Sequence, residues 1–559
     1  MKHVNTELSG LLALILNASL DQGLFPDSLK LAKVIPIFKN GKKHEVSNYR
    51  PISLLSVFSK LYEKVMHSRI LNFFNSNGCI YQRQYGFRPN HSCEHALLDA
   101  QSTIHNTLNK KQISLLLLID FSKAFDMVDH SILLDKLYKY GIRGVAHNWF
   151  KTYLSGRNQY VTVNNIKSTI NTLQHGVPQG SILGPLLFII YINDISAIDK
   201  TIDFILYADD ANILISGSTI QEIFEKLQIF LPKLEDWVNI NSLKLNTTKT
   251  KYMIFSNTPG INNISFKINN VLIERKVEDK FLGVLIDEKL NFTGHKAAIA
   301  TKISRNCGVL YRARHVLNEK SLKSLYYSFI QSHLNYCSSV WGLGHKNSLR
   351  SIFIAQKRAI RTIFFVKLYT KNETSGEYSY GNTKPFFSTS KILTVHNLIL
   401  HQALNLMHKI FIGLAPAPIL AIFSTEKPVP VNITITKSLS LLRKGIEPSN
   451  ILAHPLENTH KQFFTTPNKR LAIEKNSIST LGPKMFNYFV NTINLAHASS
   501  GKQKLKIEKL TPTTFKNYIK EKLIETQGSN DPVNWDPTNF PIYTISSTTV
   551  TLRSATFNS

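Results

Sequence analysis

Apolar positions follow two different patterns along the chain. Residues 114–119 form an almost unbroken apolar run, which is typical of a strand buried on both faces. The apolar runs 202–206 and 211–215 flank a short turn and predict a strand-turn-strand hairpin. Residues 295–365 instead carry apolar side chains at helical spacing. These patterns predict an α+β fold, with a buried sheet in the first half of the chain and helices after it.

Two apolar stripes define the helices that we expect between residues 295 and 365. Their members are Ile299, Ile303, Val309 and Leu310 in the first stripe, and Leu322, Leu325, Tyr326, Phe329 and Ile330 in the second. A stripe of this kind faces the core of a helical domain. We therefore expect these residues to be buried.

Three aspartates occur where the predicted strands end. Asp120 ends the first strand, and Asp209 and Asp210 lie in the turn of the hairpin. An ionised carboxylate in apolar surroundings is costly unless a cation or hydrogen bonds compensate it. Brought together, three such groups could hold two Mg²⁺ ions about 3.5–4 Å apart for phosphoryl or nucleotidyl transfer, with Mn²⁺ as a substitute. For the adjacent pair alone, a solvated turn is the simpler interpretation.

Two cations flank a polar turn near the N-terminus. Lys39 and Arg50 lie on either side of residues 40–44, so a hairpin would bring both to one end. Arginine as a planar fork and lysine as a point charge suit a triphosphate. The alternative is a solvated basic loop.

The segment Pro178-Gln179-Gly180-Ser181 is typical of a loop that enters an apolar helix, here expected over residues 182–195. Gly180 permits close backbone approach, and the Gln179 amide can orient a sugar or a base through hydrogen bonds. Taken alone, the sequence Pro-Gln-Gly indicates little more than a turn. Its position between the aspartate segments favours a functional interpretation.

Eight ordered blocks make the chain resemble the reverse transcriptases of non-LTR (LINE-like) retrotransposons, especially the jockey-like branch. The blocks lie at 32–39, 48–55, 84–88, 120–130, 175–185, 207–210, 243–250 and 281–284. The resemblance covers about residues 20–365 and weakens after about residue 290. It implies a right-hand polymerase, with a palm built on an antiparallel sheet backed by helices.

The resemblance also implies a division of the chain. The expected parts are an N-terminal helical lead-in (1–19), a reverse transcriptase domain (20–290) with fingers (about 20–105) and palm (about 106–290), a helical thumb (291–365), a linker (366–390), a basic C-terminal region of unknown fold (391–529) and a poorly ordered tail (530–559).

Roles for individual residues come from the same resemblance. The implied catalytic residues are Asp120, Asp209, Asp210 and Lys249, of which the three aspartates are the metal ligands. The implied nucleotide-binding residues are Lys39, Arg50, Phe121, Phe125 and Gln179. The implied template- and primer-binding residues are Arg88, Gly180, Phe281, Leu282 and Gly283.

Three of these roles have plainer alternatives. The Phe125 ring would exclude a nucleotide 2′-hydroxyl, which disfavours an RNA-dependent RNA polymerase, but it is also a common type of core residue. Lys249 would protonate the departing pyrophosphate or would simply be solvated. Arg88 would contact the template backbone or pair with a carboxylate.

Composition sets limits on the partners. The net charge is +29, from 66 Lys and Arg against 37 Asp and Glu, which favours a polyphosphate partner. By resemblance the partners are an RNA template, a DNA primer or target DNA, and dNTPs. No apolar run reaches the roughly 18 residues that a membrane-spanning helix needs. The four cysteines lack zinc-ligand spacing and fit reduced thiols in an intracellular protein. The resemblance implies that this protein acts in the nucleus, with the cytoplasm as a second location.

The expected function is target-primed reverse transcription. No aspartate lies between Asp287 and Asp531, so a ribonuclease H site with its own cluster of carboxylates is not expected. We expect the endonuclease activity to come from an upstream domain missing here or from another protein. The alternatives are a non-catalytic retroelement relic that binds RNA or DNA and an RNA-dependent RNA polymerase.

Overall fold

The computed structural model describes residues 5–258, 264–344, 346–366, 369–371, 378–423, 477–499 and 507–528. The chain divides into two compact units, here called unit 1 (Met1–His91 and Lys111–Lys276) and unit 2 (Ser92–Lys110 and Val277–Ser559). These units divide the chain differently from the expected fingers, palm and thumb, so those boundaries stay a prediction.

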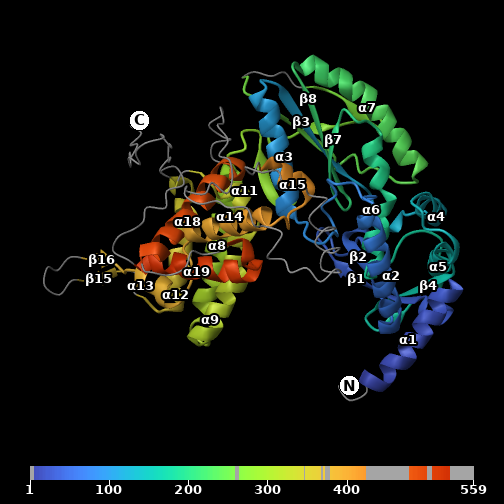
Figure 1. Cartoon of the computed structure of the whole chain (residues 1–559), viewed down its shortest axis with the longest axis horizontal. Helices are drawn as coiled ribbons and strands as arrows, with labels where there is room; N and C mark the ends of the chain where they lie inside the picture. The colour runs from blue at the N-terminus through green and yellow to red at the C-terminus, as the bar shows by residue number, and fades with distance from the viewer. Residues whose placement is uncertain are drawn as a thin grey trace. The chain divides into compact units, whose positions relative to one another are not determined.

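The central sheet of unit 1 has the strand order β12-β9-β3-β8-β7. Its strands are β3 (Ile113–Asp120), β7 (Asp203–Tyr207), β8 (Asp210–Gly217), β9 (Lys251–Phe255) and β12 (Glu274–Arg275). All neighbours pair antiparallel except β12 and β9. The predicted strand at 114–119 and the predicted hairpin are both confirmed (Figure 1).

The middle strand β3 is buried on both faces. Leu115 and Leu117 on one face and Leu116 on the other are completely buried. Leu115 and Leu117 belong to a core that also contains side chains of α6 (Leu183–Tyr191) and α7 (Ile220–Ile240). Helix α7 lies along β8 (Figure 1). Burial on both faces explains why this strand has an unbroken apolar sequence.

A second sheet of unit 1 has the order β2-β1-β4-β5, with β6 also paired to β4. Its strands are β1 (Leu31–Phe38), β2 (Tyr49–Leu54), β4 (Arg157–Val163), β5 (Ile166–Lys167) and β6 (Asn171–Leu173). Strands β1 and β2 pair antiparallel from Lys33 opposite Leu54 to Phe38 opposite Tyr49. The predicted hairpin around residues 40–44 is therefore confirmed.

The other helices of unit 1 are α1 (Asn5–Gln22), α2 (Val57–Ser76), α4 (His130–Lys139) and α5 (Gly144–Leu154), and β10 (Lys267–Ile268) pairs with β11 (Val271–Leu272). The helix predicted over 182–195 is shorter than expected. Helix α6 ends at Tyr191, and Asn193 uses its side chain to bond the Cys79 carbonyl (2.7 Å) and the Tyr140 hydroxyl (2.8 Å). A 3₁₀ turn, Asn193–Ala197, follows α6 over the remaining part of the predicted helix.

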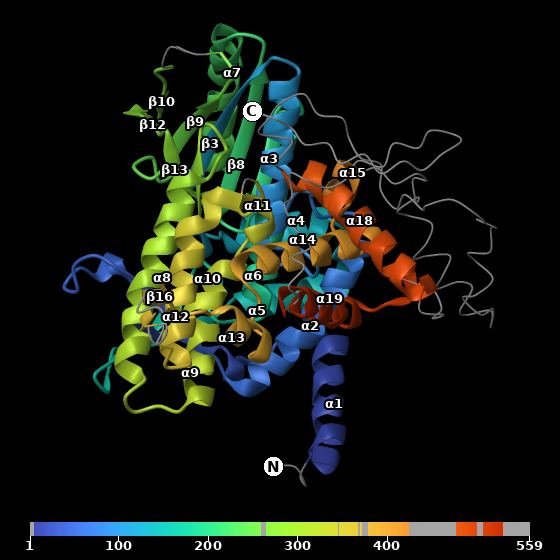
Figure 2. The same cartoon turned by 90° about the vertical axis from the view of Figure 1, so that its left-hand side faces the viewer.

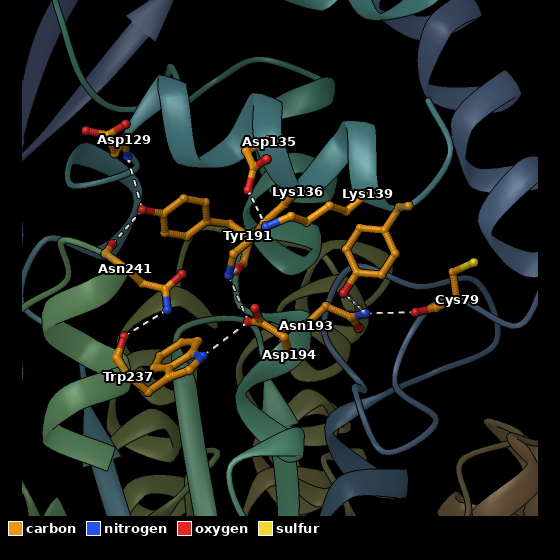
Figure 3. A network of polar contacts seen from close by, with 11 residues as sticks. Cys79, Asp129, Asp135, Lys136, Lys139, Tyr191, Asn193, Asp194, Trp237 and Asn241 are labelled. Atoms are coloured by element: carbon orange, nitrogen blue, oxygen red, sulfur yellow. Dashed lines mark hydrogen bonds and ion pairs between the residues drawn. The ribbon is translucent and has the colours of Figure 1, made fainter. Parts of the chain in front are cut away.

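A polar network anchors the helices beneath the central sheet (Figure 3). The buried Lys136 ammonium on α4 donates to the Tyr191 carbonyl (2.6 Å) and to Asp194 Oδ1 (2.8 Å). Trp237 Nε1 on α7 donates to the same Asp194 oxygen (3.2 Å), and the Tyr191 hydroxyl donates to the Asn241 carbonyl (2.5 Å). The network therefore joins α4, the end of α6 and α7.

Unit 2 is mainly helical in its described residues. Its elements are α3 (Cys93–Asn109), β13 (Glu278–Phe281), β14 (Val284–Asp287), α8 (Thr293–Ala313), α9 (Glu319–Tyr326), α10 (Ser332–Asn335), α11 (Ser338–Trp341), α12 (Arg350–Ile363), β15 (Tyr369–Lys371), β16 (Tyr378–Tyr380), α13 (Lys384–Thr389), α14 (Val395–Phe411), α15 (Ala417–Ile422), α18 (Ile478–Ser499) and α19 (Pro512–Gly528). Helices α8 and α12 lie side by side (Figure 2). The predicted tail, 530–559, lies outside the described residues.

The two predicted apolar stripes are buried except at three positions, of which Leu325 is half-buried and the other two are exposed. Val309 is 39% exposed and Phe329 is 42% exposed. Cys307 takes the place of Val309 on the buried face of α8. Phe329 lies in a π-helical turn, Tyr327–Gln331, which interrupts the α-helical spacing of the second stripe.

Two further sequence-based expectations concern membranes and thiols. Within the part of the chain that the structure describes, no helix is both long enough and apolar enough to cross a membrane. All four cysteines, Cys79, Cys93, Cys307 and Cys337, are free thiols.

The polar network yields a stability prediction. Lys136→Met removes the donor shared by Tyr191 and Asp194 and should lower the free energy of unfolding of unit 1 by about 1–3 kcal/mol. The matched control is Lys139→Met on the same helix, because the Lys139–Asp135 pair is exposed and screened by solvent and should contribute much less to stability. Denaturant unfolding followed by tryptophan fluorescence measures both changes. Equal losses in the two variants would contradict the prediction.

Candidate active site

Strand pairing brings the three predicted aspartates together. Asp120 is the last residue of β3 and lies directly opposite Asp210, the first residue of β8. Asp209 lies in the two-residue turn between β7 and β8, next to Ala208, whose φ is +55°. The end of one sheet therefore presents three carboxylates from two adjacent strands.

A segment from outside the sheet holds the turn that carries Asp209. The Gln84 side chain accepts hydrogen bonds through Oε1 from the backbone of Gly86 (2.9 Å) and of Ala208 (3.2 Å). The backbone of Tyr85 also donates to the Leu206 carbonyl (2.8 Å). A Cβ at Gly86 would collide with the backbone of Ala208, so a larger residue would displace the turn.

The carboxylates oppose one another electrostatically. Desolvation by the surrounding protein and the carboxylates of Asp209 and Asp120 raise the pKa of Asp210 to about 6, although the residue is exposed to solvent on one side. Burial also raises the pKa of Asp209, and Asp120 adds to the rise. The charges of Lys39 and Arg50 act in the other direction and lower the pKa of Asp209, so these two cations lie within electrostatic reach of it. The site is thus a concentration of negative charge with cations near it.

Lys249 pairs with the first aspartate. Its Nζ lies 3.1 Å from Oδ2 of Asp120. The position is set by the backbone, because Asn246 N–H donates to the Asp120 carbonyl (2.8 Å) and the Asn246 carbonyl accepts from the N–H of Lys249 (3.1 Å). The block 243–250 therefore lies beside the end of β3, as a role near the aspartates requires.

The β1–β2 hairpin carries the two predicted phosphate-binding cations at one end. Lys39 follows the last residue of β1, and its N–H donates to the Asn48 carbonyl (2.8 Å). Arg50 is the second residue of β2 and lies opposite Ile37. Both side chains are exposed, as a clamp for an anion requires.

Phe125 and Phe121 lie in different surroundings. The half-buried Phe125 ring stacks on Phe188, with centroids 4.7 Å apart, and meets the ring of Phe87 edge-on at 6.1 Å. Phe121 is 4% exposed and belongs to the hydrophobic core. Because the Phe121 ring is buried, Phe121 could contact a nucleotide through its backbone alone. The Phe125 ring, by contrast, is partly exposed to solvent.

The Gln179 loop is fixed between two elements. Its side-chain Nε2 donates to Asp126 Oδ1 (2.9 Å), and its carbonyl accepts from Ser53 N–H on β2 (2.8 Å). Gly180 has a φ of +137°, and a Cβ there would collide with the Ser53 carbonyl. Close approach of the loop to β2 thus explains why glycine occupies position 180.

Comparison with known families decides what kind of site this is. The family described as reverse transcriptase (RNA-dependent DNA polymerase) matches residues 39–295, a span that contains all the aspartates and cations above. Residues 39–295 are a reverse transcriptase domain. This confirms the predicted fold class, an α+β right-hand polymerase, and the predicted family.

The similar curated proteins are polymerases of mobile elements. The "Probable RNA-directed DNA polymerase from transposon BS" of Drosophila melanogaster is 30% identical over 65% of this chain and 41% of its own length. The "RNA-directed DNA polymerase from mobile element jockey" of the same organism is 31% identical over 63% of this chain and 39% of its own. The "Probable RNA-directed DNA polymerase from transposon X-element" of Drosophila melanogaster is 28% identical over 65% of this chain and 41% of its own length. The chain therefore spans about two fifths of these relatives' length.

Two predicted nucleic-acid contacts of the reverse transcriptase domain remain predictions. Arg88 donates through Nη1 to the Tyr81 carbonyl (3.1 Å) and the Gln84 carbonyl (3.3 Å), so it braces the segment that holds the catalytic turn. Phe281, Leu282 and Gly283 form the end of the β13–β14 hairpin, as predicted. This hairpin belongs to unit 2.

The donor set suits a hard divalent cation, and reverse transcriptases use a divalent metal. The described residues contain no group of three or more His, Cys, Asp or Glu side chains that already converge as a metal site. In this arrangement Asp120 Oδ2 faces Lys249 instead. The carboxylate oxygens of the three aspartates are hard ligands, so they fit Mg²⁺ or Mn²⁺ better than a softer metal.

The sequence interpretation assigned no role to three residues of this site. Gln84 holds the turn, Asp126 holds Gln179, and the buried Glu63 on α2 accepts from the N–H groups of Ile182 (2.6 Å) and Leu183 (3.4 Å) at the start of α6. Gln84 and Asp126 lie within blocks that carry the resemblance. Their partners are remote in sequence, so spacing alone does not reveal their roles.

The raised pKa of Asp210 predicts pH-dependent metal binding. A proton and a metal ion compete for this carboxylate, so affinity for Mn²⁺ should fall by up to about tenfold per pH unit as pH decreases below about 6. Isothermal titration calorimetry across this range measures the change. An affinity that is constant from about pH 5 to pH 8 would contradict the assignment.

In the metal-free protein, the raised pKa of Asp210 affects folding stability in the opposite direction from its effect on metal affinity. The folded-state pKa of Asp210, about 6, lies above its ordinary value of 3.8, so its protonated form favours folding. Stability of the metal-free protein should decrease as pH rises from about 4 through about 6. Asp210→Asn provides the control, because it should remove this part of the pH dependence.

Proposed function

We propose that this chain is the RNA-directed DNA polymerase of a non-LTR retrotransposon, which adds dNMPs to a primer 3′-hydroxyl on an RNA template. The observation that carries the proposal is the register of β3 and β8, which sets Asp120 opposite Asp210 with Asp209 in the adjoining turn. The match of residues 39–295 to reverse transcriptases supports the same reaction.

Two Mg²⁺ ions, or Mn²⁺ in their place, would be held by Asp120, Asp209 and Asp210. When bound, such ions activate the attacking hydroxyl and stabilise charge on the triphosphate and pyrophosphate. Lys39 and Arg50 bind the triphosphate, since both lie at one end of the β1–β2 hairpin and act electrostatically on Asp209.

Lys249 is the proton donor for the departing pyrophosphate in this proposal. Its contact with Asp120 supports the assignment, because the contact keeps an ammonium group at the end of the sheet. Phe125 excludes the 2′-hydroxyl of ribonucleotides. Its ring is supported by Phe188 on one face and by Phe87 at the edge, so it cannot yield easily to a larger sugar.

The biological step that we propose is target-primed reverse transcription in the nucleus. The partners are an RNA template, a DNA primer or target DNA, and dNTPs, and the net charge of +29 supports binding to nucleic acid. Similarity to the jockey and BS polymerases supports a mobile-element origin. The nick would be made by an endonuclease domain upstream or by another protein.

Primer extension tests the polymerase function. Purified protein with Mg²⁺, dNTPs and a DNA primer on an RNA template should extend the primer, and Asp209→Asn or Asp210→Asn should lower the rate at least about a hundredfold. Asp203→Asn is the matched control, because Asp203 lies on the same hairpin but forms an exposed pair with Arg83. Salt-sensitive RNA binding without any extension would instead identify a nucleic-acid-binding relic.

Sugar selection tests the role of Phe125. Phe125→Ala opens the space beside Phe188 and should raise ribonucleotide incorporation relative to deoxynucleotide incorporation by about tenfold or more. The ratio of kcat/KM for rNTP and dNTP measures the effect. An unchanged ratio would refute the gate, and equal use of both sugars by the unsubstituted protein would favour an RNA-dependent RNA polymerase.

A further inference from the structure

The backbone of the Gln179 loop is fixed on one side by the segment that follows β3. Gly176 N–H donates to the Val128 carbonyl (2.8 Å), and Val177 N–H donates to the Phe125 carbonyl (2.9 Å). Gly176 has a φ of +87°, and a Cβ there would press against the backbone of Asp126. The loop thus lies directly on residues 125–128.

On its other side, the loop is fixed by elements nearer the N-terminus. The Gln179 carbonyl accepts from Ser53 N–H on β2, and Glu63 caps the first turn of α6 through Ile182 and Leu183. The backbone on both sides of Gln179 is therefore held in place. What remains to be set is the orientation of its side-chain amide.

Asp126 sets that orientation. Its Oδ1 accepts from Gln179 Nε2 at 2.9 Å, and both side chains are half-buried. An ionised carboxylate can only accept, so the nitrogen of the amide must face Asp126 and the oxygen must face away from it. The position of Asp126 is itself fixed, because its N–H donates to the Lys123 carbonyl (2.8 Å) in the turn Ala124–Asp126.

We propose that Asp126 is a positioning residue that makes Gln179 present a hydrogen-bond acceptor to the 3′-hydroxyl of the incoming nucleotide. The inference rests on the proposed polymerase function. An amide oxygen requires a donor on its ligand, and the sugar of a dNTP has one hydroxyl, at the 3′ position. Base amino groups differ among the four nucleotides, so they cannot supply a contact common to all of them.

The experiment compares dNTPs with 2′,3′-dideoxynucleotides, which lack the proposed donor, in single-nucleotide incorporation. Asp126→Ala removes the acceptor and should lower kcat/KM for dNTPs about three- to tenfold while changing kcat/KM for ddNTPs less than about twofold. Asp126→Asn keeps the size but permits both amide orientations, so its loss should be smaller. Gln179→Ala should give the same selectivity, and adding Asp126→Ala to it should cause no further loss.

Asp199→Asn is the control for removing a carboxylate from unit 1, because among the described residues Asp199 bonds Thr201 and Lys233 and no residue of the candidate site. It should leave kcat/KM for both substrates unchanged. Equal losses for dNTPs and ddNTPs in the Asp126 variants, or no loss for either, would overturn the inference while leaving the polymerase function intact. Absence of extension by the unsubstituted protein would refute the polymerase function itself.

Discussion

The antiparallel pairing of β3 with β8 is the constraint on which the arrangement of the candidate site depends. The register of β3 and β8 sets Asp120 opposite Asp210, and the same strand β3 packs buried leucines on both faces of the sheet. The sheet core therefore stabilises an arrangement that its own polar end destabilises. The raised pKa of Asp210 is the measurable sign of this opposition.

Hydrogen bonds from neighbouring segments fix the backbone around the candidate site. Gln84 fixes the turn of Asp209, and Asn246 fixes the backbone of Asp120. The Gln179 loop lies between β2 and the segment after β3, so the strand that carries Arg50 and the segment that carries Phe125 share one connecting loop. Residues that we propose to contact the nucleotide, from distant parts of the sequence, are thus tied to a common backbone framework, which favours preorganisation.

The sequence predicted the parts of this structure that follow from local pattern. The β3 run, the hairpin of Asp209 and Asp210, and the β1–β2 hairpin follow from apolar runs and turn residues. The misplaced features do not follow from apolar spacing: α6 ends just before Asn193, whose side chain bonds the remote Cys79 carbonyl, and the exposed Phe329 lies in a π-helical turn that interrupts the helical spacing. Helix α3 contacts α11 and α15, far along the chain, which no local pattern indicates.

The pair between Asp120 and Lys249 gives the site an internal counterion. The ammonium group offsets part of the negative charge of the aspartates, so a divalent ion held there as proposed would have to displace one cation with another. Such an ion would gain less electrostatically than at a carboxylate cluster with no counterion. An ion that arrived together with a triphosphate would meet less competition, because the phosphates would offer Lys249 a new partner. Under the proposed function, the ion pair would therefore couple metal binding to nucleotide binding.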